Sequence, residues 1–129
     1  MENLKPYIAE LIAYMKNAGL LVDPLPQLVM KNDQEVGNTI LGPTGYYDPT
    51  QKMIVLYIAN RHPKDILRSF AHEMIHHCQN LEGKMDSGMS EGDPNYTQNN
   101  EAMRKLEKEA YLKGNMMFRD WTDTRKQKK

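Results

Sequence analysis

The sequence predicts a single α+β domain, because three segments with helical periodicity alternate with a few short extended segments. A chain of 129 residues matches the size of one domain. Its 40% hydrophobic and 26% charged residues are typical of a folded globular protein. We therefore expect one domain over residues 1–121, followed by a basic and disordered tail over residues 122–129.

The first helix is expected from Asn3 to Ala18, where apolar residues recur at helical spacing. Asn3 is suited to cap its start, and Gly19 is a typical stop signal. The apolar positions that define its buried stripe are Leu4, Ile8, Leu11, Ile12 and Met15.

Two strands and a bend are expected next. Prolines keep residues 22–26 extended, and Gln27–Met30 is a short strand candidate. The pair Asp48-Pro49 indicates a hairpin bend. Met53–Ala59 is an uninterrupted apolar run, rich in β-branched and aromatic residues, and is the strongest strand in the sequence.

Two further helices are expected after the strands. The first runs from about Pro63, a residue favoured in the first turn, to about Asn80. Met85–Asn100 has no periodicity and predicts a long loop of the kind that often carries function. The last helix is expected from about Asn100 to Phe118, with Trp121 anchoring its end.

Charge and hydropathy exclude several classes of protein. The 17 basic and 17 acidic residues give a formal net charge of zero, which disfavours nucleic-acid binding through overall positive charge. Four basic residues lie among the last five positions, so residues 1–124 hold 13 basic against 17 acidic residues. No apolar stretch reaches the roughly 18 residues of a membrane span. Lys5, Glu10 and Lys16 interrupt any signal-peptide pattern.

These observations favour a cytoplasmic protein without membrane contact. The single cysteine, Cys78, excludes an internal disulfide framework and a cysteine-rich zinc module.

The most informative residues form the motif His72-Glu73-Met74-Ile75-His76, an H-E-x-x-H. A spacing of four residues puts both imidazoles on one face of a helix, where they can bind one Zn²⁺ ion. Glu73 lies beside them and is placed to act as a general base on a metal-bound water molecule.

A catalytic zinc ion has three protein ligands and one water molecule, so a third ligand is needed. No histidine follows His77, which points about 100° away from His76 and is expected at the surface or beside a ligand. Cys78 lies roughly 200° from His76 and cannot reach the same ion. The third ligand is therefore expected to be a carboxylate from another element. The last helix offers Glu101, Glu107 and Glu109.

The order H-E-x-x-H, loop, and E-x-E-A on a following helix resembles the gluzincin clan of zinc peptidases. It is most similar to the minimal single-domain members found in phages and bacteria, and this resemblance implies a location in the host cytoplasm if a phage encodes the chain. The resemblance covers residues 46–118 and implies a zincin-like fold with a small, partly antiparallel sheet, an active-site helix and a C-terminal ligand helix. The HEMIH core is also similar to that of SprT-like proteases, although the histidine that those proteases carry after the motif is absent.

The resemblance also implies which residues bind the metal. In the related E-x-x-A-D/N pattern the ligand is the Glu three residues before the Ala, which corresponds to Glu107. One zinc ion per chain would then be bound by His72, His76 and Glu107, whereas a shifted register would use Glu109. Tyr111 stands where the pattern has Asp or Asn, which leaves the partner of the metal-binding histidines unassigned.

The expected function is that of a zinc-dependent metallopeptidase, in which Glu73 deprotonates a metal-activated water that attacks a peptide bond. In such peptidases a polypeptide substrate binds in extended form along an edge strand, and Met53–Ala59 is the natural candidate. A tyrosine hydroxyl could stabilise the tetrahedral intermediate. The candidates are Tyr46, Tyr47 and Tyr96.

Two other functions remain open. A peptidase-like protein with weak or no activity could bind zinc and act in binding or assembly, and ten methionines suit an adaptable surface. The intact Glu73 argues against that alternative. Another zinc hydrolase, such as a deformylase or an amidase, is disfavoured because a deformylase takes its cysteine ligand from a separate strand, whereas Cys78 follows the motif directly.

Overall fold

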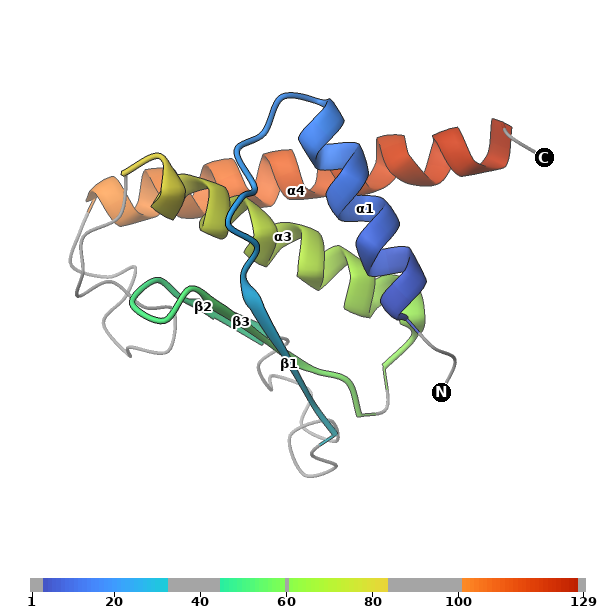
Figure 1. The fold of residues 1–129 in the computed structure, drawn as a ribbon, viewed down its shortest axis with the longest axis horizontal. Helices are drawn as coiled ribbons and strands as arrows, with labels where there is room; N and C mark the ends of the chain where they lie inside the picture. Colours follow the sequence, from blue (N-terminus) through green and yellow to red (C-terminus); the bar gives the residue numbers. More distant parts are fainter. Residues whose placement is uncertain (1–3, 33–44, 60, 84–100, 128–129) are drawn as a thin grey trace.

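The computed structural model describes residues 4–32, 45–59, 61–83 and 101–127, with side chains omitted at 101–103 and 126–127. Within these ranges the chain forms three helices and a three-stranded mixed sheet, which confirms an α+β domain (Figure 1). The elements in chain order are α1 (Lys5–Asn17), β1 (Gln27–Lys31), β2 (Gly45–Asp48), β3 (Met53–Tyr57), α3 (Pro63–Leu81) and α4 (Glu101–Gln127).

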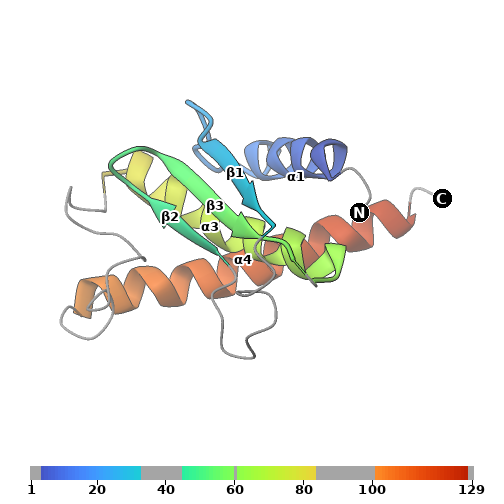
Figure 2. The ribbon, with the colours of Figure 1, turned by 90° about the horizontal axis from the view of Figure 1, so that it is seen from below.

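The sheet has the strand order β1-β3-β2, with β1 parallel and β2 antiparallel to β3. The carboxylate of Asp48 accepts hydrogen bonds from the backbone N–H groups of Thr50 (3.0 Å) and Gln51 (3.3 Å), and so closes the expected bend between β2 and β3. The three helices lie on one side of the sheet (Figures 1 and 2).

Helix α3 is the central element, because it packs against β2, β3, α1 and α4. Its buried residues extend around most of its circumference, as expected for a helix surrounded by other elements. They include four polar side chains, which therefore lie inside the domain: Glu73, His76, His77 and Gln79.

The central position of β3 corrects one expectation from the sequence. Met53–Ala59 was the candidate edge strand for substrate, but β3 is hydrogen-bonded to β1 on one side and to β2 on the other. Both of its edges are therefore occupied, and it cannot pair with another chain. The strand also ends at Tyr57, two residues earlier than expected.

The ends of α1 and α3 are close to the predicted ones. Leu4, and not Asn3, is the N-cap residue of α1, and Asn3 lies outside the described residues. Gly19 has a φ of 96° just after α1, which confirms it as the stop signal. Helix α3 starts at Pro63 as expected, and the side chain of His62 accepts a hydrogen bond from the N–H group of Lys64.

Helix α4 is longer than expected and corrects the predicted tail. It continues to Gln127, so residues 122–127 are helical, whereas Lys128 and Lys129 lie outside the described residues. Arg125 binds Glu10 of α1, and its guanidinium lies 4.9 Å from the ring centre of Tyr7. These contacts hold the end of α4 against α1. The predicted loop 85–100 also lies outside the described ranges.

Among the residues that the structure describes, no helix is both long enough and apolar enough to cross a membrane.

Helices α3 and α4 approach closely where Gly114 faces His72. A Cβ atom built on Gly114 would lie 2.9 Å from the Cα atom of His72 and 3.1 Å from its backbone nitrogen. Only a residue without a side chain fits at this crossing, which explains a glycine in the middle of a long helix despite its poor helix propensity.

We expect Gly114→Ala to destabilise the protein. The higher helix propensity of alanine gains up to about 1 kcal/mol, but forcing two helix backbones apart costs about 1–3 kcal/mol. Chemical denaturation should therefore show a lower free energy of unfolding. Lys105→Ala, at an exposed site of α4, is the control and should change it by less than about 0.5 kcal/mol. An equal or higher stability of Gly114→Ala would show that the crossing is not tight.

Candidate metal centre

The H-E-x-x-H motif lies in the middle of α3 and brings three possible metal ligands together. Ligand atoms of His72, Glu73 and His76 lie within 4.8 Å of one another. The two imidazole rings are 5.0 Å apart between centroids and nearly perpendicular. His76 is fully buried and Glu73 is 2% exposed, whereas His72 is partly open to solvent. The spacing of one helical turn therefore produces the cluster that the sequence predicts.

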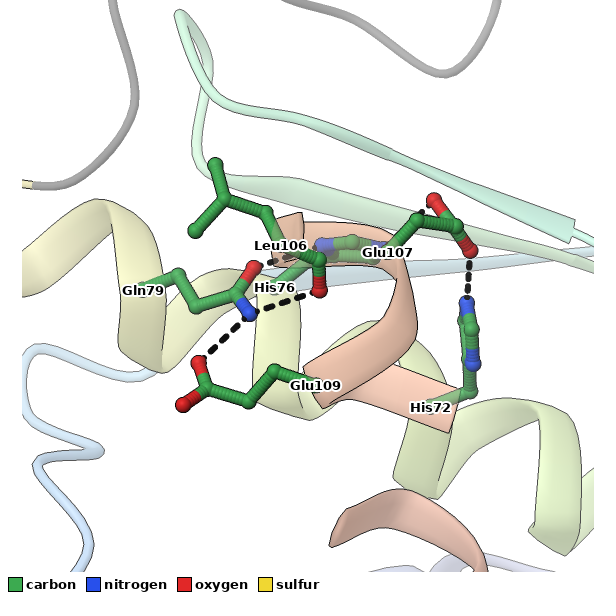
Figure 3. A network of polar contacts seen from close by, with 6 residues as sticks. All are labelled: His72, His76, Gln79, Leu106, Glu107 and Glu109. Atoms are coloured by element: carbon green, nitrogen blue, oxygen red, sulfur yellow. Dashed lines mark hydrogen bonds and ion pairs between the residues drawn. The ribbon is translucent and has the colours of Figure 1, made fainter. Parts of the chain in front are cut away.

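Glu107 of α4 reaches both histidines. Its Oε1 atom lies 2.6 Å from Nε2 of His72, and its Oε2 atom lies 3.1 Å from Nε2 of His76 (Figure 3). Burial raises the pKa of the Glu107 carboxyl, but hydrogen bonds with the two histidines outweigh burial and lower the pKa to about 2. The carboxylate is therefore ionised next to two imidazole nitrogens.

Gln79 is the partner of His76 that the sequence left unassigned. Its amide nitrogen donates to the backbone oxygen of Leu106 (2.9 Å) and to Oε1 of Glu109 (2.8 Å). Both of those atoms accept hydrogen bonds only, so the amide oxygen of Gln79 must face Nδ1 of His76, at 2.8 Å (Figure 3). Nδ1 of His76 therefore carries the hydrogen, and its Nε2 atom is the nitrogen available to a metal.

The structure also shows which of the two candidate residues of the last helix, Glu107 or Glu109, faces the histidines. Glu109 binds Gln79 and lies 3.3 Å from the ammonium group of Lys113, so its carboxylate is engaged away from the histidine pair. Glu107 is the residue that faces both imidazoles. The side chain of Glu101 is not among those described.

The donor set is compatible with a divalent metal ion. Nε2 of His72, Nε2 of His76 and the carboxylate of Glu107 converge on one place, and all three groups are common zinc ligands. The carboxylate lies within hydrogen-bonding distance of both Nε2 atoms, and a divalent cation bound by all three groups would replace these contacts. Two imidazoles and one carboxylate would supply three of the four ligands that a tetrahedral zinc site has.

A small cleft opens beside this cluster. His72, Glu73 and Glu107 form part of its wall, together with Gly45 at the start of β2 and Tyr111 and Asn115 of α4. Its volume of about 330 Å³ is near the lower end for ligand pockets. Glu73 is thus buried yet lies in the wall of a space that a substrate group can enter.

A separate polar network surrounds His77 on the side of α3 that faces the sheet. It corrects the expectations for His77 and for Tyr47. His77 is fully buried, and its Nε2–H group donates to the backbone oxygen of Pro24 at 2.7 Å. Its Nδ1 atom accepts from the hydroxyl of Tyr47 at 2.8 Å, and that hydroxyl accepts from the side chain of Asn80. Burial lowers the pKa of His77 and raises that of Tyr47 to about 12. His77 is therefore neither at the surface nor beside a ligand.

The same network excludes Tyr47 as a donor to a reaction intermediate, because its hydroxyl is committed to His77 and is not in the cleft wall. Tyr46 lies near Tyr57, with the ring centroids 6.5 Å apart, and Tyr96 lies outside the described residues. Among the tyrosines that the structure describes, Tyr111 is the one that lines the cleft. The sequence marked Tyr111 only as a departure from the E-x-x-A-D/N pattern and did not predict it as a residue of the site.

Comparisons of the chain with protein-family models, with curated proteins and with solved structures found no match. The function is therefore argued from the motif and from the geometry of this site.

We expect Gln79→Met to weaken zinc binding. Methionine keeps the volume of glutamine but cannot accept the hydrogen of His76 Nδ1, so the ring is no longer held in the metal-binding tautomer. The affinity for zinc, measured by competition with a chelator, should fall about 10- to 100-fold.

Asn80→Leu is the matched control, because Asn80 is next to Gln79 but binds Tyr47 and the backbone of Pro49. It should lower thermal stability without changing the affinity for zinc. Equal zinc affinities of Gln79→Met and the wild type would contradict the role given to Gln79.

Proposed function

We propose that the chain is a zinc-dependent metallopeptidase. The observation that carries the proposal is the convergence of Glu107 of α4 on Nε2 of both histidines of the H-E-x-x-H motif. A surface-exposed pair of helix histidines would not need a carboxylate from a second helix or a buried amide that selects the tautomer of one ring.

In the proposed site His72, His76 and Glu107 hold one zinc ion. When bound, the ion acts as a Lewis acid that polarises a peptide carbonyl and acidifies a water molecule. The ionised carboxylate of Glu107 would offset part of the charge of the ion.

Glu73 acts as the general base in this proposal. Its carboxylate takes a proton from the attacking water and then delivers that proton to the nitrogen of the leaving amine. Its position supports both steps, because it lies beside the histidines and in the wall of the cleft. The phenol of Tyr111, in the same wall, is suited to donate a hydrogen bond to the oxyanion.

The substrate is proposed to bind in extended form along β2 and not along β3. Within the described part of the sheet, β2 is an outer strand, and its first residue, Gly45, lines the cleft. An extended peptide beside β2 would place its backbone next to His72 and Glu73.

Metal analysis and activity of paired variants test this function. We expect the wild type to bind one zinc ion per chain and to cleave an unstructured protein such as casein. Glu73→Gln should retain zinc but lose at least about 100-fold in kcat/KM, because it removes the general base. Glu107→Gln should weaken zinc binding more than Glu109→Gln, because only Glu107 contacts both histidines.

Two outcomes would contradict the proposal. A wild-type protein that binds no zinc would show that His72 and His76 are ordinary helix residues. Zinc binding without cleavage of casein or of peptide libraries would instead favour a peptidase-like protein that acts in binding or assembly.

A further inference from the structure

A second and larger hollow lies next to the cleft, between the outward sides of α3 and α4. Its volume is about 880 Å³. It shares three wall residues with the cleft, namely Arg68, Tyr111 and Asn115. The two spaces are therefore adjacent, and a chain bound in the cleft can continue into the larger one. We call the larger space the α3–α4 groove.

One wall of the α3–α4 groove is apolar and exposed. Among the described residues, five large hydrophobic side chains are exposed, and three of them line this groove: Tyr111 (62% exposed), Leu112 (57%) and Met116 (43%). They occupy neighbouring turns of α4. Exposed apolar side chains that gather in a hollow, instead of being scattered, are typical of a binding surface.

The remaining wall is mostly basic. Lys64, Arg68 and Arg119 line the groove against a single acidic residue, Asp123. Neither Lys64 nor Arg119 forms an ion pair with any residue in the described ranges. Arg68 lies 3.0 Å from Asp65, but both side chains of this pair are about half exposed, so the pair contributes little and leaves the guanidinium accessible.

We propose that the α3–α4 groove binds an acidic segment of the polypeptide substrate next to the bond that is cleaved. Carboxylates of that segment pair with Lys64, Arg68 and Arg119, and an apolar side chain between them packs against Leu112 and Met116. This inference rests on the proposed peptidase function, because it takes the occupant of the groove to be the continuation of the chain in the cleft.

The charges and the exposed apolar side chains of the groove favour a polypeptide over a nucleic acid. A chain of phosphates would gain from the three basic residues but nothing from the exposed Leu112 and Met116, and Asp123 would repel it. An acidic peptide with apolar residues matches both walls. Because the chain as a whole has no net charge, its overall charge does not favour acidic partners, and the proposed preference rests on the basic residues of this groove.

Peptide binding tests the inference separately from catalysis. The probes are two fluorescein-labelled peptides of equal length that contain leucine, one with Asp and Glu and the other with Asn and Gln at the same positions. Binding is measured by fluorescence anisotropy on full-length Glu73→Gln protein with zinc present, so that turnover does not interfere. We expect the acidic peptide to bind about 3- to 10-fold tighter, and this difference to shrink at about 0.5 M salt.

Two double variants with the same change in charge test whether the preference for the acidic peptide arises in the groove. Lys64→Glu/Arg119→Glu should abolish or reverse the preference for the acidic peptide. Lys105→Glu/Lys108→Glu, on an exposed part of α4 outside the groove, should retain it. Met116→Ser should weaken the binding of both peptides, because it removes part of the apolar wall.

Equal binding of the two peptides, or an equal loss in both double variants, would overturn the inference. The inference would also be overturned if a labelled single-stranded DNA bound more tightly than the acidic peptide and Met116→Ser did not change the binding of the DNA. That result would indicate a site for polyanions. A failure of the proposed function can be told apart from a failure of this inference. If the protein prefers the acidic peptide but the zinc-loaded wild type does not cleave it, the groove is a binding site and the protein is not a peptidase.

Discussion

The amide of Gln79 joins the two helices on which the proposed metal site depends. Its nitrogen is bound by the backbone of Leu106 and by Glu109, both on α4, and its oxygen faces His76 on α3. The packing of α4 therefore decides which nitrogen of His76, on another helix, faces Gln79 and which faces Glu107. The same packing delivers Glu107 to both imidazoles, and the lack of a side chain at Gly114 allows it.

His76 and His77, which are consecutive in α3, contact different parts of the domain. His76 faces α4 and belongs to the candidate metal centre, whereas His77 faces the sheet and binds Tyr47 and the backbone of Pro24. Both rings are fully buried, so each ring nitrogen needs a defined partner. The network around His77 connects α3 to β2 and to the segment before β1, and it thereby fixes the sheet relative to the helix that carries the motif.

Several elements were predictable because their causes are local. Pro63 starts α3, Gly19 ends α1, and the apolar run from Met53 forms a strand. The prediction of an edge strand at Met53–Ala59 was wrong because the order of strands depends on pairing partners that are distant in the chain. The prediction of a disordered tail was wrong for residues 122–127 for a similar reason, since Arg125 is held by Glu10 and Tyr7 of α1.

The sequence by itself determined the cluster on α3, because the four-residue spacing of His72 and His76 places both rings on one face of any α-helix. From the sequence, the third ligand of the proposed metal site was also expected to be a carboxylate of the last helix. Only the tertiary structure decided that Glu107 and not Glu109 faces the histidines, that Gln79 orients His76, and that Tyr111 lines the cleft. Each of these depends on the rotation and separation of α4 relative to α3, which the packing of two distant segments sets and which no local pattern encodes.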